Sequence, residues 1–388
     1  MKMKLYYLTR SYSPYQKGGG SLMRTGAVKY LQQLGWDIVV VLPNFDSTNL
    51  IIQDNIIQIP FKKKYMQKLT SLQERVGLYE DYLDKWVENA LEYLEYKVQK
   101  NDILFATSGG ELGMIKLGSI LKKRVECKFV INFRDPVNYG YMNGLRRDKK
   151  FHIGREKAHE KYMGNADLIL TSSEYYADVL SQKFPYLSTK IKNNYFGYIQ
   201  LLDIERFEKK ISQKLKIAYV GIMGETQSPE LLYKSWKALD DDMIEIYFIG
   251  NVSNYKPLQN INDKGVHFID FMPHNEFLKF MHENIDIGFV SLVNDYFGAC
   301  VPSKIYEYIN LGLPMIGALP EGDGKEIINN GYGLACGYDN IECISESIKK
   351  MKDKNYLLKI KEKILNDRFD WSMEQRIIDV DKYLRNLL

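Results

Sequence analysis

The sequence predicts an α/β protein of two domains, each a largely parallel, doubly wound β-sheet wrapped by helices. Three observations carry this prediction. The chain has 388 residues, too many for one ordinary hydrophobic core and suitable for two domains. Apolar strand-like runs alternate with amphipathic helix-like runs in both halves, which is typical of parallel sheets. A charged, non-periodic stretch at 200–214 separates the halves.

The first half opens with a strand, a glycine loop, a helix and a second strand. The expected helix, 22–35, has apolar residues on one face and stops at Gly35. A long helix-like stretch follows at 64–99. Further expected strands are 102–108, 127–136 and 167–173, and expected helices are 110–124, 154–165 and 174–184. This half forms the first predicted domain, 1–200.

The second half repeats the alternation without a residue-level repeat. Expected strands are 215–221, 244–250, 266–271, 285–292, 314–319 and 331–336, and helices are expected at 229–239 and 274–284. These elements form the second predicted domain, 215–371. The tail, 372–388, reads as an amphipathic helix that packs back on the first domain.

The overall composition and charge limit the classes of partner and the compartment that we expect for the chain. Hydrophobic residues make up 45% of the chain and charged residues 26%, as in globular proteins. The formal net charge of +4 is small for this length, so we expect no nucleic-acid partner. Cys127, Cys300, Cys336 and Cys343 lack metal-ligand spacing and are too few for a disulfide scaffold, which fits a reducing cytoplasm.

No targeting or membrane-spanning segment is expected. The N-terminus turns polar too early for a signal peptide, and no apolar run approaches the roughly 18 residues of a membrane span. We expect a cytoplasmic protein, with any membrane contact peripheral and on the inner face. Two basic segments with aromatic residues, 61–68 and 144–155, either contact anionic lipid or a phosphate-linked acceptor, or form a solvated basic face.

A glycine loop follows the first strand of each half. The run Lys17–Ser21 contains Gly19 and Gly20, and the second loop contains Gly221 and Gly224. Glycines allow close backbone approach to a ligand, and a helix N-terminus attracts anions. The spacing of the first loop does not match a dinucleotide fingerprint, and no acidic ribose-binding residue stands about 20 positions on. A plain flexible turn is the alternative for this loop.

Arg134 and Asp135 stand at the carboxyl end of a predicted strand, where open α/β sheets bind ligands. A carboxylate there is able to accept a proton from an attacking hydroxyl, and the guanidinium is able to hold a phosphate oxygen. The alternative is that the two side chains only pair with each other or cap local backbone groups.

The segment 301–317, "VPSKIYEYINLGLPMIG", predicts a helix that begins near Pro302. Ser303 and Lys304 lie in its first turn, and Lys304 shares a face with Glu307. Lys304 would bind a diphosphate while Glu307 accepts hydrogen bonds from ribose hydroxyls. A salt bridge on an exposed helix face is the alternative.

No metal site or other cofactor is expected. The acidic run 240–242 lies between a helix and a strand, where solvated turn carboxylates are usual. The five histidines are dispersed along the chain without ligand spacing.

Nearly the whole chain resembles a retaining glycosyltransferase of the GT-B fold, most similar to family 4 and to bacterial enzymes that build polysaccharide, capsule or lipopolysaccharide. The stretches that carry the resemblance are 18–43, 129–136, 166–180, 220–224, 266–281 and, most specifically, 301–318. The resemblance implies two Rossmann-like domains facing an interdomain cleft, with the acceptor bound by the first and a nucleotide sugar by the second.

The resemblance also implies roles for single residues. Arg134 and Asp135 fall where many relatives carry a catalytic-site histidine. The implied donor contacts are Glu307 to ribose, Ser303 and Lys304 beside the diphosphate, Gly221 on the phosphate side, Gly19 and Gly20 near the diphosphate and transferred sugar, and Phe271 and Met272 along the base.

The sequence departs from the family in two places. Ala299 stands where many relatives carry a second glutamate, and no basic residue follows Gly221 until Lys234. The overall expectation is metal-independent, retaining transfer of a sugar from a UDP- or GDP-sugar to a hydroxyl of a saccharide acceptor on a lipid carrier. Two rivals stay open: a nucleotide-sugar epimerase or hydrolase of the same fold, and a non-catalytic subunit that binds nucleotide sugars.

Overall fold

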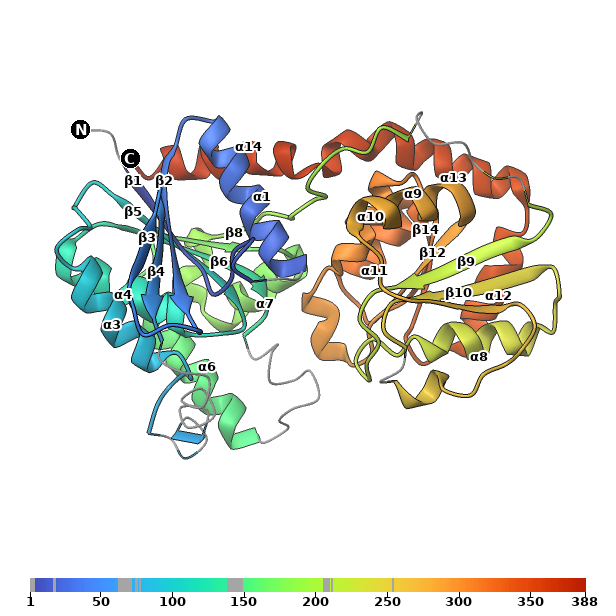
Figure 1. Cartoon of the computed structure of the whole chain (residues 1–388), viewed down its shortest axis with the longest axis horizontal. Helices are drawn as coiled ribbons and strands as arrows, with labels where there is room; N and C mark the ends of the chain where they lie inside the picture. Colours follow the sequence, from blue (N-terminus) through green and yellow to red (C-terminus); the bar gives the residue numbers. More distant parts are fainter. Residues whose placement is uncertain are drawn as a thin grey trace. The chain divides into compact units, whose positions relative to one another are not determined.

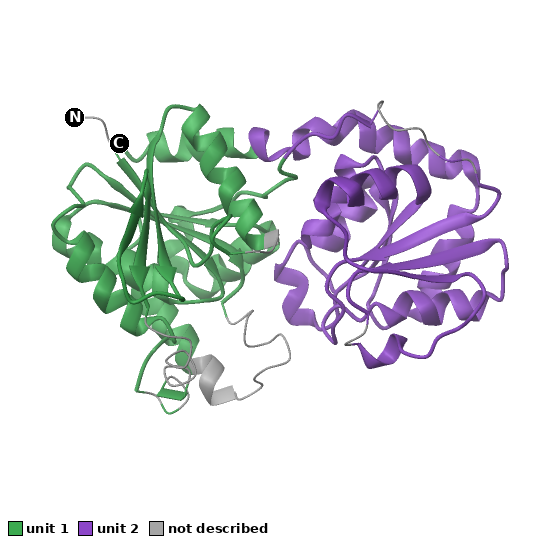
Figure 2. Cartoon of the chain, viewed as in Figure 1, with its two compact units in different colours: residues 1–199, 376–388 green, residues 200–375 purple. Residues whose placement is uncertain are grey.

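The chain divides into two compact units, each built on its own sheet (Figure 2). Unit 1 comprises residues 1–199 and 376–388, and unit 2 comprises residues 200–375. The computed structural model describes residues 4–16, 19–61, 72–73, 76, 78–137, 149–204, 210, 212–252 and 255–388.

Unit 1 has a sheet with the strand order β3-β4-β2-β1-β5-β6-β7-β8. All pairings between its described strands are parallel except the one between β3 and β4. The strands are β1 (Lys4–Leu8), β2 (Asp37–Asn44), β3 (Ile51–Gln53), β4 (Ile56–Pro60), β5 (Ile103–Gly109), β6 (Lys128–Asp135), β7 (Leu168–Thr171) and β8 (Ile191–Asn193).

Helices cover this sheet (Figure 1). They are α1 (Gly19–Gln33), α3 (Asp84–Leu94), α4 (Gly113–Val125), α6 (Lys149–Met163) and α7 (Glu174–Lys183), followed by the short 3-10 helix Pro185–Lys190. In α3 the buried side chains of Trp86, Val87, Ala90 and Leu94 recur at helical spacing, so one face of the helix packs on the protein. Every residue of β2 after the first is buried, as expected for a strand covered on both faces.

The C-terminal helix α14 (Met373–Arg385) contributes its later residues to unit 1. The indole Nε1 of Trp36 donates a hydrogen bond to Oδ1 of Asp381 at 2.7 Å, and Nη2 of Arg385 donates to the carbonyl oxygen of Leu34 at 3.1 Å. These contacts tie the end of the chain to the loop that follows α1.

Unit 2 has a sheet with the order β11-β10-β9-β12-β13-β14, and each pairing between its described strands is parallel. The strands are β9 (Leu215–Val220), β10 (Ile244–Ile249), β11 (Val266–Ile269), β12 (Ile287–Ser291), β13 (Met315–Ala318) and β14 (Gly333–Cys336). The helices of this unit are α8 (Glu230–Leu239), α9 (His274–Asn284), α10 (Ser303–Asn310), α11 (Asp323–Ile327), α12 (Ile341–Met351) and α13 (Lys354–Asp367).

The strand order reverses direction once in each sheet, between β1 and β5 in unit 1 and between β9 and β12 in unit 2. In open α/β sheets, ligands bind beyond the carboxyl ends of the strands at such a switch point. The predicted α/β class with two parallel-dominated sheets is confirmed.

Three predicted helices have different bounds in the structure, among them α6, which begins at Lys149 where the sequence predicted a start at 154. The first begins at Gly19, so Gly19, Gly20 and Ser21 lie in its first turn rather than in a loop. The long helix-like stretch predicted at 64–99 contains α3, which spans only Asp84–Leu94. It starts late because the carboxylate of Asp81 accepts the backbone N–H of Leu83 at 2.9 Å, which stabilises a turn.

A disulfide joins Cys336, at the end of β14, to Cys343 in α12. Cys127 and Cys300 are free and buried. The sequence analysis did not foresee this local link, because a spacing of seven residues does not by itself bring two cysteines together. None of the described helices is both long enough and apolar enough to cross a membrane.

Candidate functional site

Two clusters of side chains, each including predicted site residues, lie at the two switch points, one in each unit. The unit 2 cluster consists of Tyr219, Gly221, His274, Lys304 and Glu307. The unit 1 cluster consists of Arg24, Glu111, Arg134 and Asp135. Each cluster is described by its own geometry.

Lys304 is the basic centre of the unit 2 cluster. Its Nζ donates a hydrogen bond to the hydroxyl of Tyr219 at 3.0 Å and lies 4.3 Å from the centre of the same ring. Burial lowers the pKa of Lys304 to about 7. Among the described carboxylates none forms an ion pair with this ammonium, so an anion bound here would meet a cation that has no other counter-charge.

Gly221 directly follows β9 and adopts the left-handed region, with φ of 109°. A Cβ at this position would lie 3.1 Å from Cε of Lys304 and 3.6 Å from Nζ. The loops after β9 and β10 also approach closely, because a Cβ on Gly250 would lie 2.4 Å from the carbonyl oxygen of Gly221. Because Gly221 and Gly250 have no side chains, the Lys304 side chain has room beside the backbone of these loops.

Glu307 lies near the start of α10, on the same face as Lys304, and is partly exposed. Its Oε1 is 3.5 Å from Nε2 of His274, and this carboxylate raises the pKa of His274. Its Oε2 is buried and has no hydrogen-bond partner within the part of the chain that the structure describes. A hydroxyl group of a ligand would satisfy that oxygen.

The other donor residues predicted in unit 2 also lie at this edge of the sheet, whereas Gly19 and Gly20 lie in the first turn of α1 in unit 1. Ser303 is the exposed first residue of α10, where backbone N–H groups lack helical partners. Phe271 is 85% exposed in the loop between β11 and α9, and Met272 beside it is partly buried. Ala299, which replaces the second glutamate of many relatives, is buried in a short 3-10 turn.

Arg24 is the most deeply buried cation of the unit 1 cluster, with 6% of its surface exposed. Its Nε donates to the hydroxyl of Thr107 at 3.3 Å, and its Nη1 donates to the hydroxyl of Ser11. Its Nη2 is 3.6 Å from Oε1 of Glu111, which is also buried. Burial and the nearby charge of Arg134 lower the pKa of Arg24 to about 10.

Asp135 ends β6 beside Gly109 of β5, where a β-bulge shifts the register between the two strands. A Cβ on Gly109 would lie 3.2 Å from Oδ2 of Asp135, 3.3 Å from Oε2 of Glu111 and 3.7 Å from Nη2 of Arg24. Three charged groups thus surround one point that carries no side chain. Burial raises the pKa of Asp135; Glu111 adds to the rise, and Arg134 and Arg24 oppose it.

Arg134 turns toward the first helix rather than forming an ion pair with Asp135. Its Nη1 donates to the carbonyl oxygen of Gly20 at 2.8 Å, and its guanidinium lies 5.1 Å from the ring centre of Phe196. The alternative in which Arg134 and Asp135 only pair with each other is therefore not what the structure has. Lys17, the first residue of the predicted glycine loop, lies outside the described residues.

The loop that carries Glu111 is fixed by a second buried ion pair. Nη1 of Arg155 is 3.1 Å from Oδ2 of Asp81, and Nη2 donates to the carbonyl oxygen of Gly110 at 2.7 Å. The N–H of Gly109 in turn donates to Oε2 of Glu111 at 2.9 Å. The Glu111 carboxylate is therefore held in one position before any ligand arrives.

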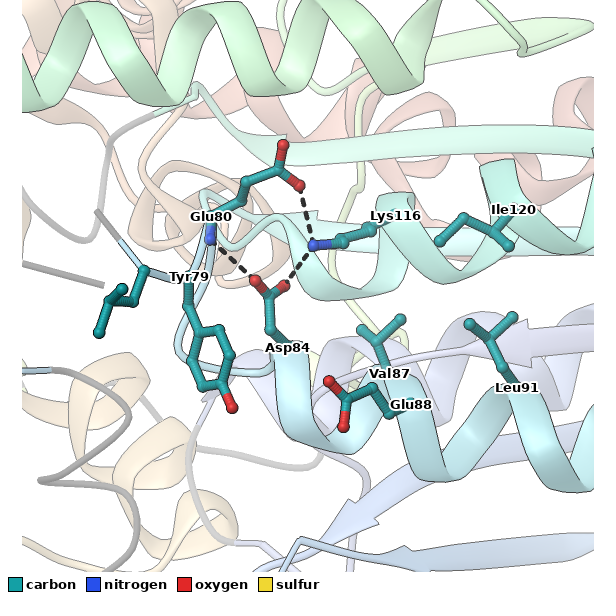
Figure 3. A pocket seen from close by; sticks show the side chains of 9 residues that line it. Tyr79, Glu80, Asp84, Val87, Glu88, Leu91, Lys116 and Ile120 are labelled. Atoms are coloured by element: carbon teal, nitrogen blue, oxygen red, sulfur yellow. Dashed lines mark hydrogen bonds and ion pairs between the residues drawn. The ribbon is translucent and has the colours of Figure 1, made fainter. Parts of the chain in front are cut away.

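A pocket of about 320 Å³ lies between α3 and α4, and its lining includes no residue of either cluster (Figure 3). The ammonium of Lys116 lies 2.8 Å from Glu80 and 2.9 Å from Asp84, and the apolar wall includes Val87 and Leu91. Glu80 is paired with Lys161 as well, and Glu88 is paired with Lys85, so each described ion of the pocket already has a partner of opposite charge. It has no counterpart to the free oxygen of Glu307.

Sequence reasoning missed four members of the clusters: Arg24, Glu111, Tyr219 and His274. Arg24 lies three residues after the predicted glycine loop Lys17–Ser21, and that position was the available indication. Glu111 follows Gly109 and Gly110, which the sequence pattern did not single out. His274 was set aside as dispersed, although it follows the predicted Phe271–Met272 loop directly. Within the described residues, no three His, Cys, Asp or Glu side chains gather as metal ligands would.

Comparisons with known proteins bear on the fold. No family model and no curated protein sequence matches the chain. A solved structure of sucrose-phosphate synthase from Thermosynechococcus elongatus superposes with a TM-score of 0.71 at 13% identity, covering 99% of both chains. The lipopolysaccharide outer core galactosyltransferase WaaB in its apo form gives 0.70 at 12% identity over 100% of both chains.

A third similar structure is Anabaena HepE in complex with UDP and glucose. It superposes with a TM-score of 0.69 at 13% identity and covers 99% of this chain and 100% of its own. Similarity over full length at such low identity reflects the shared architecture of two parallel-sheet units. The chain therefore has the GT-B fold of these glycosyltransferases.

Proposed function

We propose that the protein is a glycosyltransferase that moves a sugar from a nucleoside-diphosphate sugar, UDP- or GDP-linked, to a hydroxyl group of an acceptor. The observation that carries this proposal is Lys304, a cation with no carboxylate partner among the described residues, next to Gly221 at a switch point. A diphosphate is the ligand that such a combination of ammonium, bare backbone and helix N-terminus suits.

The donor binds unit 2 through three sets of contacts, which involve the unit 2 cluster, the N-terminus of α10 and the loop before α9. Lys304 and the backbone N–H groups at Ser303 contact the diphosphate. Oε2 of Glu307, buried and without a described partner, accepts hydrogen bonds from ribose hydroxyls. Phe271 and Met272 lie along the base, where the exposed ring of Phe271 offers a stacking surface.

The acceptor hydroxyl binds unit 1 at Asp135. The acceptor oxygen forms a bond to the anomeric carbon, and the bond from that carbon to the diphosphate oxygen breaks. The departing nucleoside diphosphate keeps the electron pair, which Lys304 and the N-terminus of α10 stabilise. The acceptor's proton passes to the Asp135 carboxylate, and the family resemblance assigns Arg134 to the catalytic part of the site and Gly19 and Gly20 to the transferred sugar.

The finer features of the proposal come from the family resemblance. They are retention of anomeric configuration, similarity to family 4, independence of metal, and an acceptor saccharide on a lipid carrier in bacterial capsule or lipopolysaccharide synthesis. The neighbour WaaB is a lipopolysaccharide galactosyltransferase, and HepE was solved with UDP and glucose, which supports a UDP-sugar donor and a surface-polysaccharide acceptor. A cytoplasmic enzyme that contacts the membrane peripherally suits that acceptor, because a lipid carrier lies in the membrane.

A thermal-shift screen with UDP, GDP, CDP and their sugars tests the donor. A ligand at 100 times its Kd stabilises the native state by about 2.7 kcal/mol. For a unit of this size, that shifts the Tm by several degrees, about 2–4 °C for each kcal/mol. Stabilisation by one nucleoside diphosphate, lost in Lys304→Met, supports the proposal, and no response to any nucleotide contradicts it.

Turnover separates the two rivals from a transferase. An epimerase or hydrolase changes the bound sugar without an acceptor, whereas a transferase releases nucleoside diphosphate quickly only when an acceptor is present. A binding subunit gives a thermal shift without turnover across a panel of donors and acceptors.

A further inference from the structure

The unit 1 cluster contains two charged residues that the proposed function leaves without a role. We propose that Arg24 and Glu111 are positioning residues for the Asp135 carboxylate, acting on it with opposite charges. This inference rests on the proposed function, in which Asp135 receives the acceptor's proton. It extends that function by naming the groups that set the pH range in which Asp135 is ionised and able to accept the proton.

The geometry around Gly109 carries the inference. Oδ2 of Asp135, Oε2 of Glu111 and Nη2 of Arg24 all lie within 3.7 Å of the point where a Cβ of Gly109 would be. The β-bulge between Ser108 and Gly109 shifts the register, so that Gly109 pairs with Asp135. Any side chain at Gly109 would fill the space that the three groups share.

Burial makes both charges effective. Arg24 and Glu111 are 6% and 5% exposed, so little water lies between them and Asp135. Both are fixed: Arg24 is held by Thr107 and Ser11, and Glu111 by the N–H of Gly109. Groups held this firmly act on Asp135 from constant positions.

The Glu111 carboxylate is only partly used inside the protein. Its Oε1 is buried, has no hydrogen-bond partner among the described residues, and meets Arg24 only at 3.6 Å. A fully structural ion pair would close this distance. The loose contact leaves the negative charge of Glu111 available to act on Asp135.

The charges that face Asp135 come from three directions. Arg134 is its neighbour on β6, Arg24 comes from α1, and Glu111 comes from the loop between β5 and α4. Tyr7 on β1 is buried beside the arginines and stays neutral, because burial raises its pKa to about 12. Glu111 makes the Asp135 carboxylate easier to protonate, and the two arginines make it harder.

The test compares two substitutions with opposite expected effects. In Glu111→Gln the titration of Asp135 and the acid limb of the pH–rate profile both move to lower pH. In Arg24→Met both move to higher pH. Each shift is about one pH unit, the effect expected of one nearby charge at a partly exposed site. Asp135 is followed by carboxyl ¹³C NMR, with its resonance assigned by its loss in Asp135→Asn.

Glu95→Gln is the matched control, because Glu95 is also paired with an arginine, Arg124, at 2.6 Å on unit 1 but at an exposed site. It leaves the Asp135 titration in place. If Arg24→Met does not fold, the double variant Arg24→Met/Glu111→Gln removes both charges without leaving Glu111 alone. Its Asp135 titration returns toward the wild-type value, because the two shifts offset each other.

Shifts in the same direction, or an unmoved Asp135 titration in a folded Glu111→Gln variant, overturn the inference. The NMR measurement needs no turnover. If the protein transfers no sugar, the proposed function fails while the titration still decides whether Arg24 and Glu111 act on Asp135.

Discussion

Replacing Lys304 by methionine removes the charge of the unit 2 cluster while keeping an unbranched apolar side chain. In the folded protein the pKa of Lys304 is lowered to about 7 from the ordinary 10.5. The unfolded chain therefore binds more protons than the native protein between these values, and stability rises with pH across that interval. Below pH 7, Lys304 is charged in both states, and its burial destabilises the native state fully.

The size of this effect follows from the two pKa values. At 1.36 kcal/mol for each pKa unit, the difference corresponds to an upper bound of about 5 kcal/mol at pH 6. Lys304 is partly exposed, and screening by solvent reduces this to roughly 1–3 kcal/mol. We therefore expect Lys304→Met to be more stable than the wild type at pH 6, and to lose that advantage by about pH 10.

Urea unfolding at pH 6, 8 and 10 measures this difference. Lys349→Met is the control, because Lys349 is exposed and paired on the surface with Glu346. Its free energy of unfolding changes by less than about 0.5 kcal/mol. A Lys304→Met variant that is less stable than the wild type at pH 6 would show that the ammonium is solvated, and would refute the reasoning.

Three further substitutions test the site and its support. Glu307→Gln weakens donor binding about tenfold, seen as a raised donor KM with kcat retained, because an amide is a poorer acceptor for ribose hydroxyls; an unchanged KM removes Glu307 from the donor site. Arg155→Met lowers the free energy of unfolding by about 3–5 kcal/mol, because it leaves Asp81 buried without its partner; a loss below 1 kcal/mol in urea unfolding would contradict this. Gly250→Ala also destabilises, by roughly 1–3 kcal/mol, because its Cβ would lie 2.4 Å from a carbonyl oxygen; wild-type stability would show that the loop is free to shift.

The fold was largely predictable because its strands are continuous apolar runs. Segments such as Asp37–Asn44 and the centre of Leu215–Val220 are buried on both faces, and such runs differ clearly from amphipathic helices. The start of α1 was less predictable. Gly19 and Gly20 have low helix propensity, yet both lie in its first turn, where tertiary contacts decide the conformation.

The candidate site was predictable only where its residues are close in sequence. Lys304 and Glu307 lie within one turn of α10, so their common face follows from helical spacing. The contact of Glu307 with His274 joins two elements far apart in the chain, and that of Lys304 with Tyr219 joins α10 to β9. Such pairs depend on the sheet topology, which a single sequence does not provide.

The unit 1 cluster shows the same limit. Arg134 and Asp135 stand at a strand end that the sequence indicates, and their adjacency suggested a mutual pair. The structure gives Arg134 the carbonyl oxygen of Gly20 and brings Glu111 and Arg24 toward Asp135. The register of β5 against β6, including its bulge, decides these neighbours.

The central claim is that the unit 2 cluster binds a diphosphate through Lys304. Isothermal titration of the nucleoside diphosphate found by the screen, at pH 8 in two buffers of different ionisation enthalpy, measures it directly. Because the pKa of Lys304 is about 7, most of the ammonium is deprotonated before binding, and a diphosphate restores its charge. The account predicts uptake of close to one proton by the wild type, and binding about 10–100 times weaker without proton uptake in Lys304→Met. Equal binding by the two proteins, with no proton uptake in either, would contradict it.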